Sequence, residues 1–238
     1  MDKPLGHKAY GSIPHLPESR LGPKDYHIQL GQAGILTKKT RDWRDLIIVQ
    51  EKLDGSNVAI AKHKGKIIAL TRSGYLATTS PYEQHHIFAE FVEDNKKRFH
   101  MVLEEGERIS GEWMLQACSI EYNLPHSPFV AFDIFNSKNK RILYLDLVER
   151  IALIKGIVAL PRLIHIGGPV SPHKLRDALK TSGHGAIGQP EGGVWRCERL
   201  GRVDFLAKWV RPDKEDGTLL NKEVYNTLPA QWAEYTPT

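Results

Sequence analysis

A lysine that could act as a nucleophile stands at the end of an apolar run. Lys52 follows Leu46–Val49 and lies two residues before the turn pair Asp54-Gly55. Strands that end in a loop with Lys, Asp and Gly can present a reactive side chain from a rigid scaffold. A lysine amine attacks only when it is neutral, and its usual pKa is about 10.4. The pattern therefore suggests covalent chemistry at Lys52, against the simpler interpretation of a solvated lysine beside an Asp-Gly turn.

Five further motifs follow Lys52 in order along the chain. They are Arg72-Ser73-Gly74, Gly111-Glu112, Phe132-Asp133-Ile134-Phe135, Glu191-Gly192-Gly193-Val194 and Lys208-Trp209-Val210-Arg211. A Lys-x-Asp-Gly match alone arises by chance in roughly one chain in twenty of this length, so the ordered set carries the argument. This succession, from about Gln50 to Arg211, resembles the covalent nucleotidyltransferase superfamily of polynucleotide ligases and messenger RNA capping enzymes.

Within that superfamily the chain is most similar to RNA ligases of the second phage type and their bacterial relatives. The segment Lys8–Leu21 resembles the one that precedes the nucleotidyl lysine in some bacterial RNA ligases, and Asn57 is a feature of that branch. The resemblance implies an ATP-dependent RNA ligase that uses Mg²⁺ or Mn²⁺. Lys52 would attack the α-phosphorus of ATP to form lysyl-AMP, AMP would pass to a 5′-phosphate RNA end, and a 3′-hydroxyl would displace it.

The resemblance also implies roles for individual residues. The catalytic residues would be Lys52, Lys208 and Glu191, and the metal-binding residues would be Glu191 and Asn57. The ATP-binding residues would be Glu51, Asp54, Asn57, Arg72, Glu112, Phe132, Lys208 and Arg211. Asp54 would shape the loop through backbone hydrogen bonds, and Lys208 would neutralise the α-phosphate. The family often has a second lysine two residues after Lys208, where this chain has Val210, and Arg211 is the expected substitute.

The residue types suit these roles, although each has an ordinary alternative. Phe132 offers a flat apolar platform for adenine, and Arg72 offers a planar fork for the ribose or a terminal phosphate. The family resemblance implies that Glu51 lies near the adenine, that Glu112 accepts a hydrogen bond from a ribose hydroxyl and that Glu191 binds the metal. The alternatives are a core phenylalanine, a surface arginine and structural ion pairs. A carboxylate among apolar strand residues is costly without some such partner.

The elements that would position these residues are mostly strands. Apolar and alternating runs predict strands at 46–49, 58–61, 67–71, 108–114, 129–135, 193–198 and 203–210, with hairpin turns at Lys64-Gly65 and at Arg199-Leu200-Gly201-Arg202. Helical spacing and capping residues predict helices at 83–99, from Asp146 to Lys155 and from Ser171-Pro172 to about Leu179. Strands outnumber helices and do not alternate with them. The pattern therefore favours an α+β fold of mixed, largely antiparallel sheets with flanking helices. The resemblance implies a nucleotidyltransferase or ATP-grasp-like ligase domain.

The length of 238 residues suits one domain over 1–238. The first 40 residues, rich in Pro and Gly, should form an irregular arm, and residues 213–238 a short extension. Only 27 residues follow Arg211, so we expect no appended oligonucleotide-binding-fold domain of the kind that DNA ligases and capping enzymes normally carry. The alternatives are a DNA ligase or capping-type nucleotidyltransferase, and an RNA-end-binding module without catalysis.

Composition and net charge limit the expected binding partners and the expected cellular compartment. A net charge of +5 points mildly towards a nucleic acid. The expected partners are RNA ends with a 5′-phosphate and a 3′-hydroxyl, with nicked duplex as an option, and a protein that delivers the RNA. Cys118 and Cys197 fit neither a disulfide framework nor a zinc site. No apolar run reaches the roughly 18 residues of a membrane span, so we expect a cytoplasmic protein without membrane contact.

Overall fold

The protein is built on two four-stranded sheets, and the computed structural model describes residues 3–237. Sheet A has the order β6-β1-β7-β8 and sheet B the order β3-β2-β4-β5. The strands are β1 Asp45–Lys52, β2 Ser56–His63, β3 Lys66–Thr71, β4 Arg108–Trp113, β5 Phe129–Phe135, β6 Leu163–Gly167, β7 Gly192–Arg199 and β8 Arg202–Val210. Neighbouring strands in both sheets pair antiparallel. The expected α+β fold with antiparallel sheets is confirmed.

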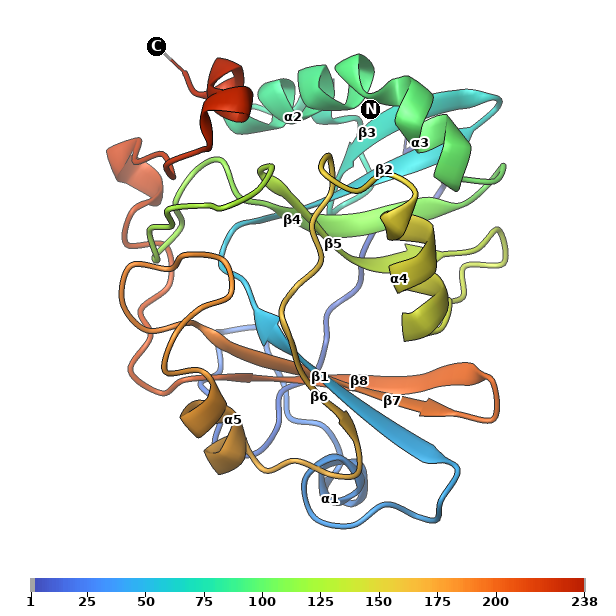
Figure 1. The fold of residues 1–238 in the computed structure, drawn as a ribbon, viewed down its shortest axis with the longest axis vertical. Helices are drawn as coiled ribbons and strands as arrows, with labels where there is room; N and C mark the ends of the chain where they lie inside the picture. The colour runs from blue at the N-terminus through green and yellow to red at the C-terminus, as the bar shows by residue number, and fades with distance from the viewer. Residues whose placement is uncertain (1–2, 238) are drawn as a thin grey trace.

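Helices pack around the two sheets (Figure 1). The helices are α1 Leu30–Thr37, α2 Glu83–Asp94, α3 Lys96–Val102, α4 Tyr144–Ala152 and α5 Pro172–Ala178. Short 3-10 turns occur at Ala77–Thr79, Leu220–Lys222 and Ala230–Tyr235. Helices α2 and α3 lie over sheet B, whereas α1 and α5 lie beyond sheet A (Figure 1). Within residues 3–237, no helix has both the length and the apolar character needed to cross a bilayer.

Each sheet packs its own apolar cluster against its helices. On sheet B, Phe88 and Phe91 of α2 pack against Trp113 and Phe129, with ring centroids 5.2 to 6.3 Å apart. On sheet A, side chains of α1 and α5 surround the fully buried Trp195. Burial of side chains this large is the main favourable term in folding. The sheet B cluster also includes Ile48 of β1, so apolar contacts continue between the two sheets beside the polar cavity described below.

Both predicted hairpins form where the turn residues allow it. Lys64 and Gly65 have φ values of 52° and 73°, and Leu200 and Gly201 have φ values of 50° and 73°. Two successive residues with positive φ are what a tight hairpin turn of matching twist requires. Glycine adopts this conformation without steric cost, which explains its place at the second position of both turns.

One predicted helix is interrupted. The helix predicted at 83–99 breaks at Asn95, which separates α2 from α3 and has φ −102° and ψ 9°. The Asn95 side-chain amide donates a hydrogen bond to the carbonyl of Phe91 at 2.9 Å. Asparagine competes in this way for the backbone groups of a helix. The prediction of one continuous helix was therefore wrong.

The capping predictions had mixed outcomes. Ser171 accepts a hydrogen bond from the backbone N–H of Lys174 at 3.3 Å, which confirms it as the cap of α5. Helix α4 begins at Tyr144 and ends at Ala152, so Asp146 lies in its first turn and is not its cap. An acidic residue in a first turn still favours the helix dipole.

The N-terminal arm is more regular than expected, and one strand was not predicted. Helix α1 buries Ala33 and Leu36 against sheet A within the segment expected to be irregular. Strand β6 forms one edge of sheet A, and its residues are all exposed or half-buried. A short edge strand of this kind lacks the alternation that marks a strand in the sequence.

A buried ion pair joins the two sheets. Asp133 of β5 in sheet B pairs with the guanidinium of Arg196 of β7 in sheet A. It also accepts hydrogen bonds from Arg141 Nε and from the hydroxyl of Tyr10, both at 2.8 Å. Burial alone would raise the pKa of Asp133, but the charges of Arg196 and Arg141 outweigh it and hold the pKa below its usual value.

We predict that Asp133→Asn lowers the free energy of unfolding by about 3–5 kcal/mol, because it leaves a buried guanidinium without its charge partner. The folded-state pKa of Asp133 lies below the usual value of 3.8. Its stabilisation is therefore complete above that value and is lost as pH falls through the folded pKa. Urea unfolding measured from neutral to acid pH should show a weaker acid dependence in the variant. Asp146→Asn, at an exposed position, is the control. Equal stability and equal acid dependence of Asp133→Asn and wild type would contradict the prediction.

Candidate active site

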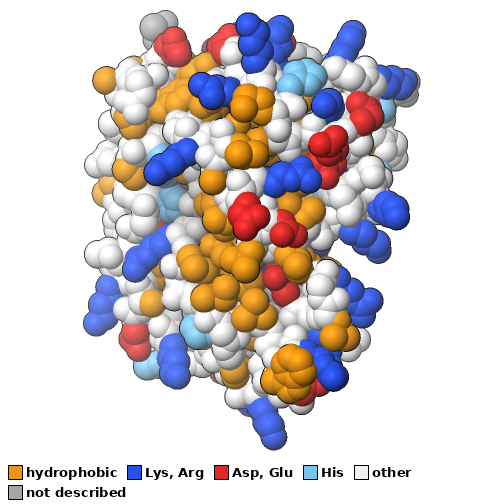
Figure 2. Space-filling model, turned by 45° about the vertical axis from the view of Figure 1, so that its right-hand side comes forward, with side chains coloured by type: hydrophobic (Ala, Val, Ile, Leu, Met, Phe, Trp, Pro, Cys, Tyr) orange, Lys and Arg blue, Asp and Glu red, His pale blue; other side chains and the backbone are white. Residues whose placement is uncertain are grey.

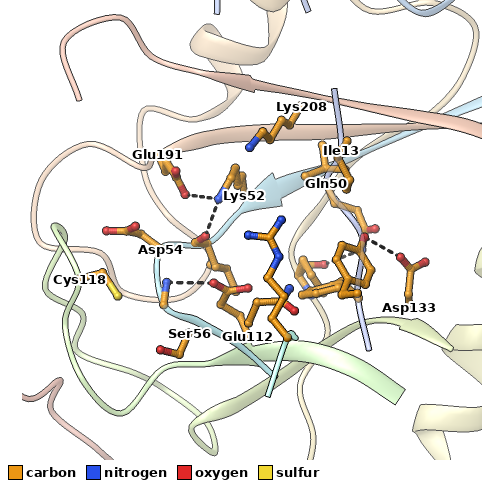
Figure 3. Close-up of a pocket in the computed structure, with 18 of the residues that line it drawn as sticks. Ile13, Gln50, Lys52, Asp54, Ser56, Glu112, Cys118, Asp133, Glu191 and Lys208 are labelled. Atoms are coloured by element: carbon orange, nitrogen blue, oxygen red, sulfur yellow. Dashed lines mark hydrogen bonds and ion pairs between the residues drawn. The ribbon is translucent and has the colours of Figure 1, made fainter. Parts of the chain in front are cut away.

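A cavity of about 550 Å³ lies between the two sheets. The chain crosses from sheet A to sheet B beside it, in the short connection from β1 to β2. The predicted site residues that line the cavity are Glu51, Lys52, Asp54, Asn57, Arg72, Glu112, Phe132, Glu191 and Lys208. Figure 3 shows Lys52 and Lys208 entering from one side and Glu112 and Ser56 from the other.

Lys52 is aimed into the cavity by the pairing of β1 with β7. As the last residue of β1 it lies opposite Gly192, the first residue of β7, and so comes beside Glu191. Lys52 Nζ lies 2.6 Å from Glu191 Oε2 and donates to the carbonyl of Leu53 at 3.1 Å (Figure 3). Glycine is needed at 192, because a Cβ there would lie 1.9 Å from the carbonyl oxygen of Trp209.

The carboxylates of the cavity keep Lys52 charged. Burial lowers the pKa of Lys52, but the carboxylates of Glu191 and Glu112 outweigh burial and raise the pKa above its usual value. Lys52 is therefore an ammonium at neutral pH. An ammonium is not nucleophilic until it loses a proton.

A second lysine, which no motif in the sequence marks, lies on the other side of Glu191. Lys214 Nζ donates to Glu191 Oε1 and Asp54 Oδ1, both at 2.9 Å, and to Asp216 Oδ1 at 3.0 Å. Its side chain is 3% exposed. Lys214 is hidden in the sequence because its immediate neighbours are acidic, a pattern typical of a solvated loop.

The two predicted arginines have different surroundings. Arg72 lines the cavity, and its Nη2 donates to Ser12 Oγ at 3.2 Å. Arg211 is not among the described residues that line the cavity, and its Nη1 donates to Asp213 at 2.5 Å. The expectation that Arg211 replaces the absent second lysine is therefore not supported.

Hydrogen bonds to the backbone fix the loop between β1 and β2. Asp54 Oδ2 accepts from the backbone N–H of Ser119 at 2.8 Å and from that of Ile120 at 3.1 Å. Glu112 Oε1 accepts from the backbone N–H of Gly55 at 3.2 Å. Burial raises the pKa of Glu112 to about 7, with nearby carboxylates adding to the rise and Lys52 opposing it. Asp54 is thus placed to shape the loop, as the sequence predicts.

Two side chains could hold a divalent metal. Asn57 lies opposite Glu112 in the β2–β4 register, and its buried Oδ1 has no hydrogen-bond partner among residues 3–237. A buried amide oxygen without a partner is costly, and Mg²⁺ prefers oxygen ligands. Glu191 is the second candidate. The described part of the chain contains no group of three or more His, Cys, Asp or Glu placed to hold a metal ion. Asn57 and Glu191 fit a hard cation that is also bound by phosphate oxygens and water.

Aromatic and apolar side chains form part of the lining. Phe132 packs edge to face on Tyr10 of the arm, with ring centroids 5.0 Å apart. Glu51 is 2% exposed and accepts hydrogen bonds from the hydroxyl of Ser182 and, at 2.8 Å, from the backbone N–H of Gly183. These contacts tie β1 to the loop that precedes β7. Both carboxylate oxygens of Glu51 are thereby engaged within the protein.

The N-terminal arm extends sheet A beside Lys208. The backbone N–H of Leu16 donates to the carbonyl of Lys208 at 2.8 Å, and that of Lys208 donates to the carbonyl of Pro14 at 2.9 Å. Lys208 Nζ lies 3.5 Å from Asp25 Oδ1, and the other Asp25 oxygen lies 3.0 Å from His15 Nε2. The arm thus supplies the anion that balances Lys208 in the ligand-free protein.

We predict that Glu191→Gln makes Lys52 more reactive towards a neutral amine reagent at about pH 8. Removing the anion leaves burial to dominate, so the pKa of Lys52 falls and a larger fraction of the amine is neutral. Competitive labelling with acetic anhydride, followed by mass spectrometry, measures the reactivity of Lys52 relative to that of the exposed Lys66 as internal reference. A rise of about tenfold corresponds to one pKa unit. Unchanged or lower reactivity of Lys52 would show that Glu191 does not hold its proton.

Solved structures with the same fold come from RNA ligases. A Naegleria gruberi RNA ligase variant without ligand aligns with a TM-score of 0.55 at 15% identity, over 88% of this chain and 60% of that one. Variants of the Naegleria ligase with AMP and Mn, and with ATP and Mn, align with TM-scores of 0.52 and 0.50 at 14% and 17% identity. These alignments cover 86% and 83% of this chain and 60% and 59% of the ligase chains. At such identities the likeness shows the fold alone.

Family membership follows from a separate comparison. The chain spans about 60% of the length of the Naegleria ligase chain that it matches. A search of curated protein sequences found no match. The family model described as RNA ligase matches residues 45–210, which run from the start of β1 to the end of β8 and contain most of the cavity lining. Because this match covers well over half of the chain, the protein belongs to the RNA ligase family.

Proposed function

We propose that the chain joins RNA ends in an ATP-dependent reaction that passes through lysyl-AMP on Lys52. The observation that supports this best is the Lys52 ammonium at the end of β1, paired with Glu191 in a cavity that also presents Lys208. A nucleophilic amine needs a carboxylate to manage its proton and cations to stabilise the phosphate charge. Membership of the RNA ligase family supplies the reaction class.

In the first step Lys52 Nζ attacks the α-phosphorus of ATP. A nitrogen–phosphorus bond forms while the bond from the α-phosphorus to the bridging oxygen breaks, and pyrophosphate leaves. The ammonium gives up one proton before the attack and a second proton as the new bond forms. Lys208, which is half-buried in the cavity, is placed to neutralise phosphate charge. In the later steps the 5′-phosphate of RNA takes the AMP, and a 3′-hydroxyl displaces it.

Mg²⁺ or Mn²⁺ is the proposed cofactor, and Glu191 and the unpartnered Oδ1 of Asn57 would hold it. Such a cation supplies neutralisation of the phosphate oxygens when it is bound. When Glu191 turns away from Lys52, burial is left to lower the pKa of the amine. This exchange of partners would couple nucleotide entry to activation of Lys52.

The adenine would stack on Phe132. The edge-to-face contact with Tyr10 fixes the Phe132 ring, and a fixed ring loses little freedom when a base covers it. Glu51 would act mainly by holding the Ser182–Gly183 loop against β1, because both its oxygens already accept hydrogen bonds. Arg72 would contact the ribose or a terminal phosphate, and Glu112 would accept a hydrogen bond from a ribose hydroxyl.

The proposed substrates are RNA ends with a 5′-phosphate and a 3′-hydroxyl, in single strands or in nicked duplex. On the face shown in Figure 2, Lys and Arg side chains are spread around a central band of hydrophobic side chains. Phosphate contacts supply most of the affinity that does not depend on sequence. Because a lone catalytic domain offers few phosphate contacts, the proposal includes a protein partner that delivers the RNA. The unpaired Cys118 and Cys197 suit the proposed cytoplasmic location.

Incubation with Mg²⁺ and ATP labelled at the α-phosphate should leave label on the wild-type protein through denaturation. Lys52→Ala should carry no label, because the attacking amine is gone. Lys66→Ala, which removes an exposed lysine at the start of β3, is the matched control and should label normally.

Other outcomes of that assay would favour other functions. Labelling of Lys52→Ala would contradict the proposal outright. Labelling by GTP in place of ATP would favour a capping-type enzyme, and sealing of nicked DNA without sealing of RNA would favour a DNA ligase. RNA-end binding by a wild-type protein that takes no label would favour a non-catalytic binding module.

We predict that Phe132→Ala raises the ATP concentration for half-maximal labelling by about 5- to 150-fold, because loss of a base–aromatic stack costs about 1–3 kcal/mol. Phe132→Tyr keeps the ring and should stay close to wild type. The measurement is the initial labelling rate as a function of ATP concentration. A lower maximal rate with unchanged half-saturation would contradict the stacking role.

A further inference from the structure

The carboxylate of Glu191 is shared between two ammonium groups. Its Oε2 lies 2.6 Å from Lys52 Nζ, and its Oε1 lies 2.9 Å from Lys214 Nζ. Glu191 itself is 4% exposed, so it is a buried anion with two cationic contacts. The proposed reaction at Lys52 uses only one of these contacts. Lys214 reaches the cavity from the segment after β8, beyond the residues that the family model matches.

Lys214 is anchored in its place. A lysine ammonium has three N–H donors, and those of Lys214 donate hydrogen bonds to Glu191, Asp54 and Asp216. The Asp54 side chain is itself fixed, because its second oxygen accepts from the backbone N–H groups of Ser119 and Ile120. Backbone, Asp54, Lys214 and Glu191 thus form one continuous chain of contacts. That chain ends on the amine of Lys52.

The proposed chemistry changes the charge on one side of this arrangement. Lys52 ceases to be a cation when it gives up its first proton before the attack, and its hydrogen-bonded ion pair with Glu191 is then lost. Glu191 and Asp54 remain buried carboxylates. A buried carboxylate without any counter-charge is strongly destabilising, so Glu191 then depends on its remaining cationic contact. Lys214 is the cation that stays beside both carboxylates when Lys52 no longer can.

We propose that Lys214 is a positioning residue that holds Glu191 and Asp54 in their reactive arrangement while Lys52 loses its charge. The inference rests on the proposed function, because it concerns the lysyl-AMP step. Lys214 acts through the carboxylates and not by binding ATP, since its three donors are already engaged inside the protein. The partner Asp216, whose side chain is 60% exposed, balances the remaining charge on the solvent side.

The test compares four variants in single-turnover labelling with ATP labelled at the α-phosphate. Lys214→Met removes the charge and keeps the length of the side chain, and Lys214→Arg keeps the charge. Lys214→Gln keeps hydrogen-bond donors without the charge, and it serves as the neutral variant if Lys214→Met fails to fold. Lys222→Met, at an exposed lysine of the same C-terminal segment, is the matched control. Circular dichroism establishes which variants are folded.

Lys214→Met and Lys214→Gln should lower the maximal labelling rate by about 100-fold or more. The ATP concentration for half-maximal labelling should change by less than about threefold. This is the pattern of an interaction that acts in the reaction and not in binding. Lys214→Arg should recover at least about a tenth of the wild-type rate, which a merely structural loss would not allow. Lys222→Met should behave as wild type.

Three results would overturn the inference. They are an unchanged maximal rate in folded Lys214→Met or Lys214→Gln, a rise in half-saturating ATP at an unchanged maximal rate, and failure of Lys214→Arg to recover activity although it folds. The second result would make Lys214 a phosphate-binding residue. Absence of label on the wild-type protein would instead refute the proposed function itself, so the two failures are distinguishable.

Discussion

The active-site arrangement depends on the Glu191 carboxylate being held between the ammonium groups of Lys52 and Lys214. The antiparallel register of β1 on β7 sets this contact, because it brings Lys52 opposite Gly192 and hence beside Glu191. Only glycine lets β7 approach the carbonyl of Trp209 so closely at this point. A shift of one residue in this register would turn Lys52 to the other face of the sheet. The chemistry is thus a consequence of strand pairing.

The rest of the fold serves to keep this cavity open and its walls rigid. Apolar clusters attach the helices to the sheets, and the larger cluster also joins Ile48 of sheet A to sheet B, beside the cavity where polar residues collect. The ion pair between Asp133 and Arg196 ties sheet B to sheet A across that space. Side chains that must be placed precisely lie at strand ends and on the short β1–β2 connection, where the scaffold fixes their direction. The buried Oδ1 of Asn57, which has no hydrogen-bond partner among residues 3–237, is the feature of this cavity that supports its proposed role in metal binding.

The sequence was most informative where local pattern and tertiary structure agree. Strand β5 has the predicted bounds, and the turn at Lys64-Gly65 forms as its residues require. Strand β6 and the break at Asn95 were missed because edge pairing and a single side-chain hydrogen bond leave little periodic signal. Arg211 was chosen because it is adjacent in sequence to the last strand. Lys214 takes a place in the cavity because the chain turns back after β8, and no local pattern reports such a turn.

The central claim is that Lys52 faces the α-phosphate of ATP once its pairing with Glu191 is released. A crystal structure of the protein with Mn²⁺ and an ATP analogue that resists cleavage between the α- and β-phosphates tests it most directly. The account predicts that Lys52 Nζ lies about 3–3.5 Å from the α-phosphorus, opposite the leaving pyrophosphate, and that Glu191 has turned towards the metal. A nucleotide bound outside this cavity, or bound within it while Lys52 remains paired with Glu191 and remote from the α-phosphorus, would contradict it.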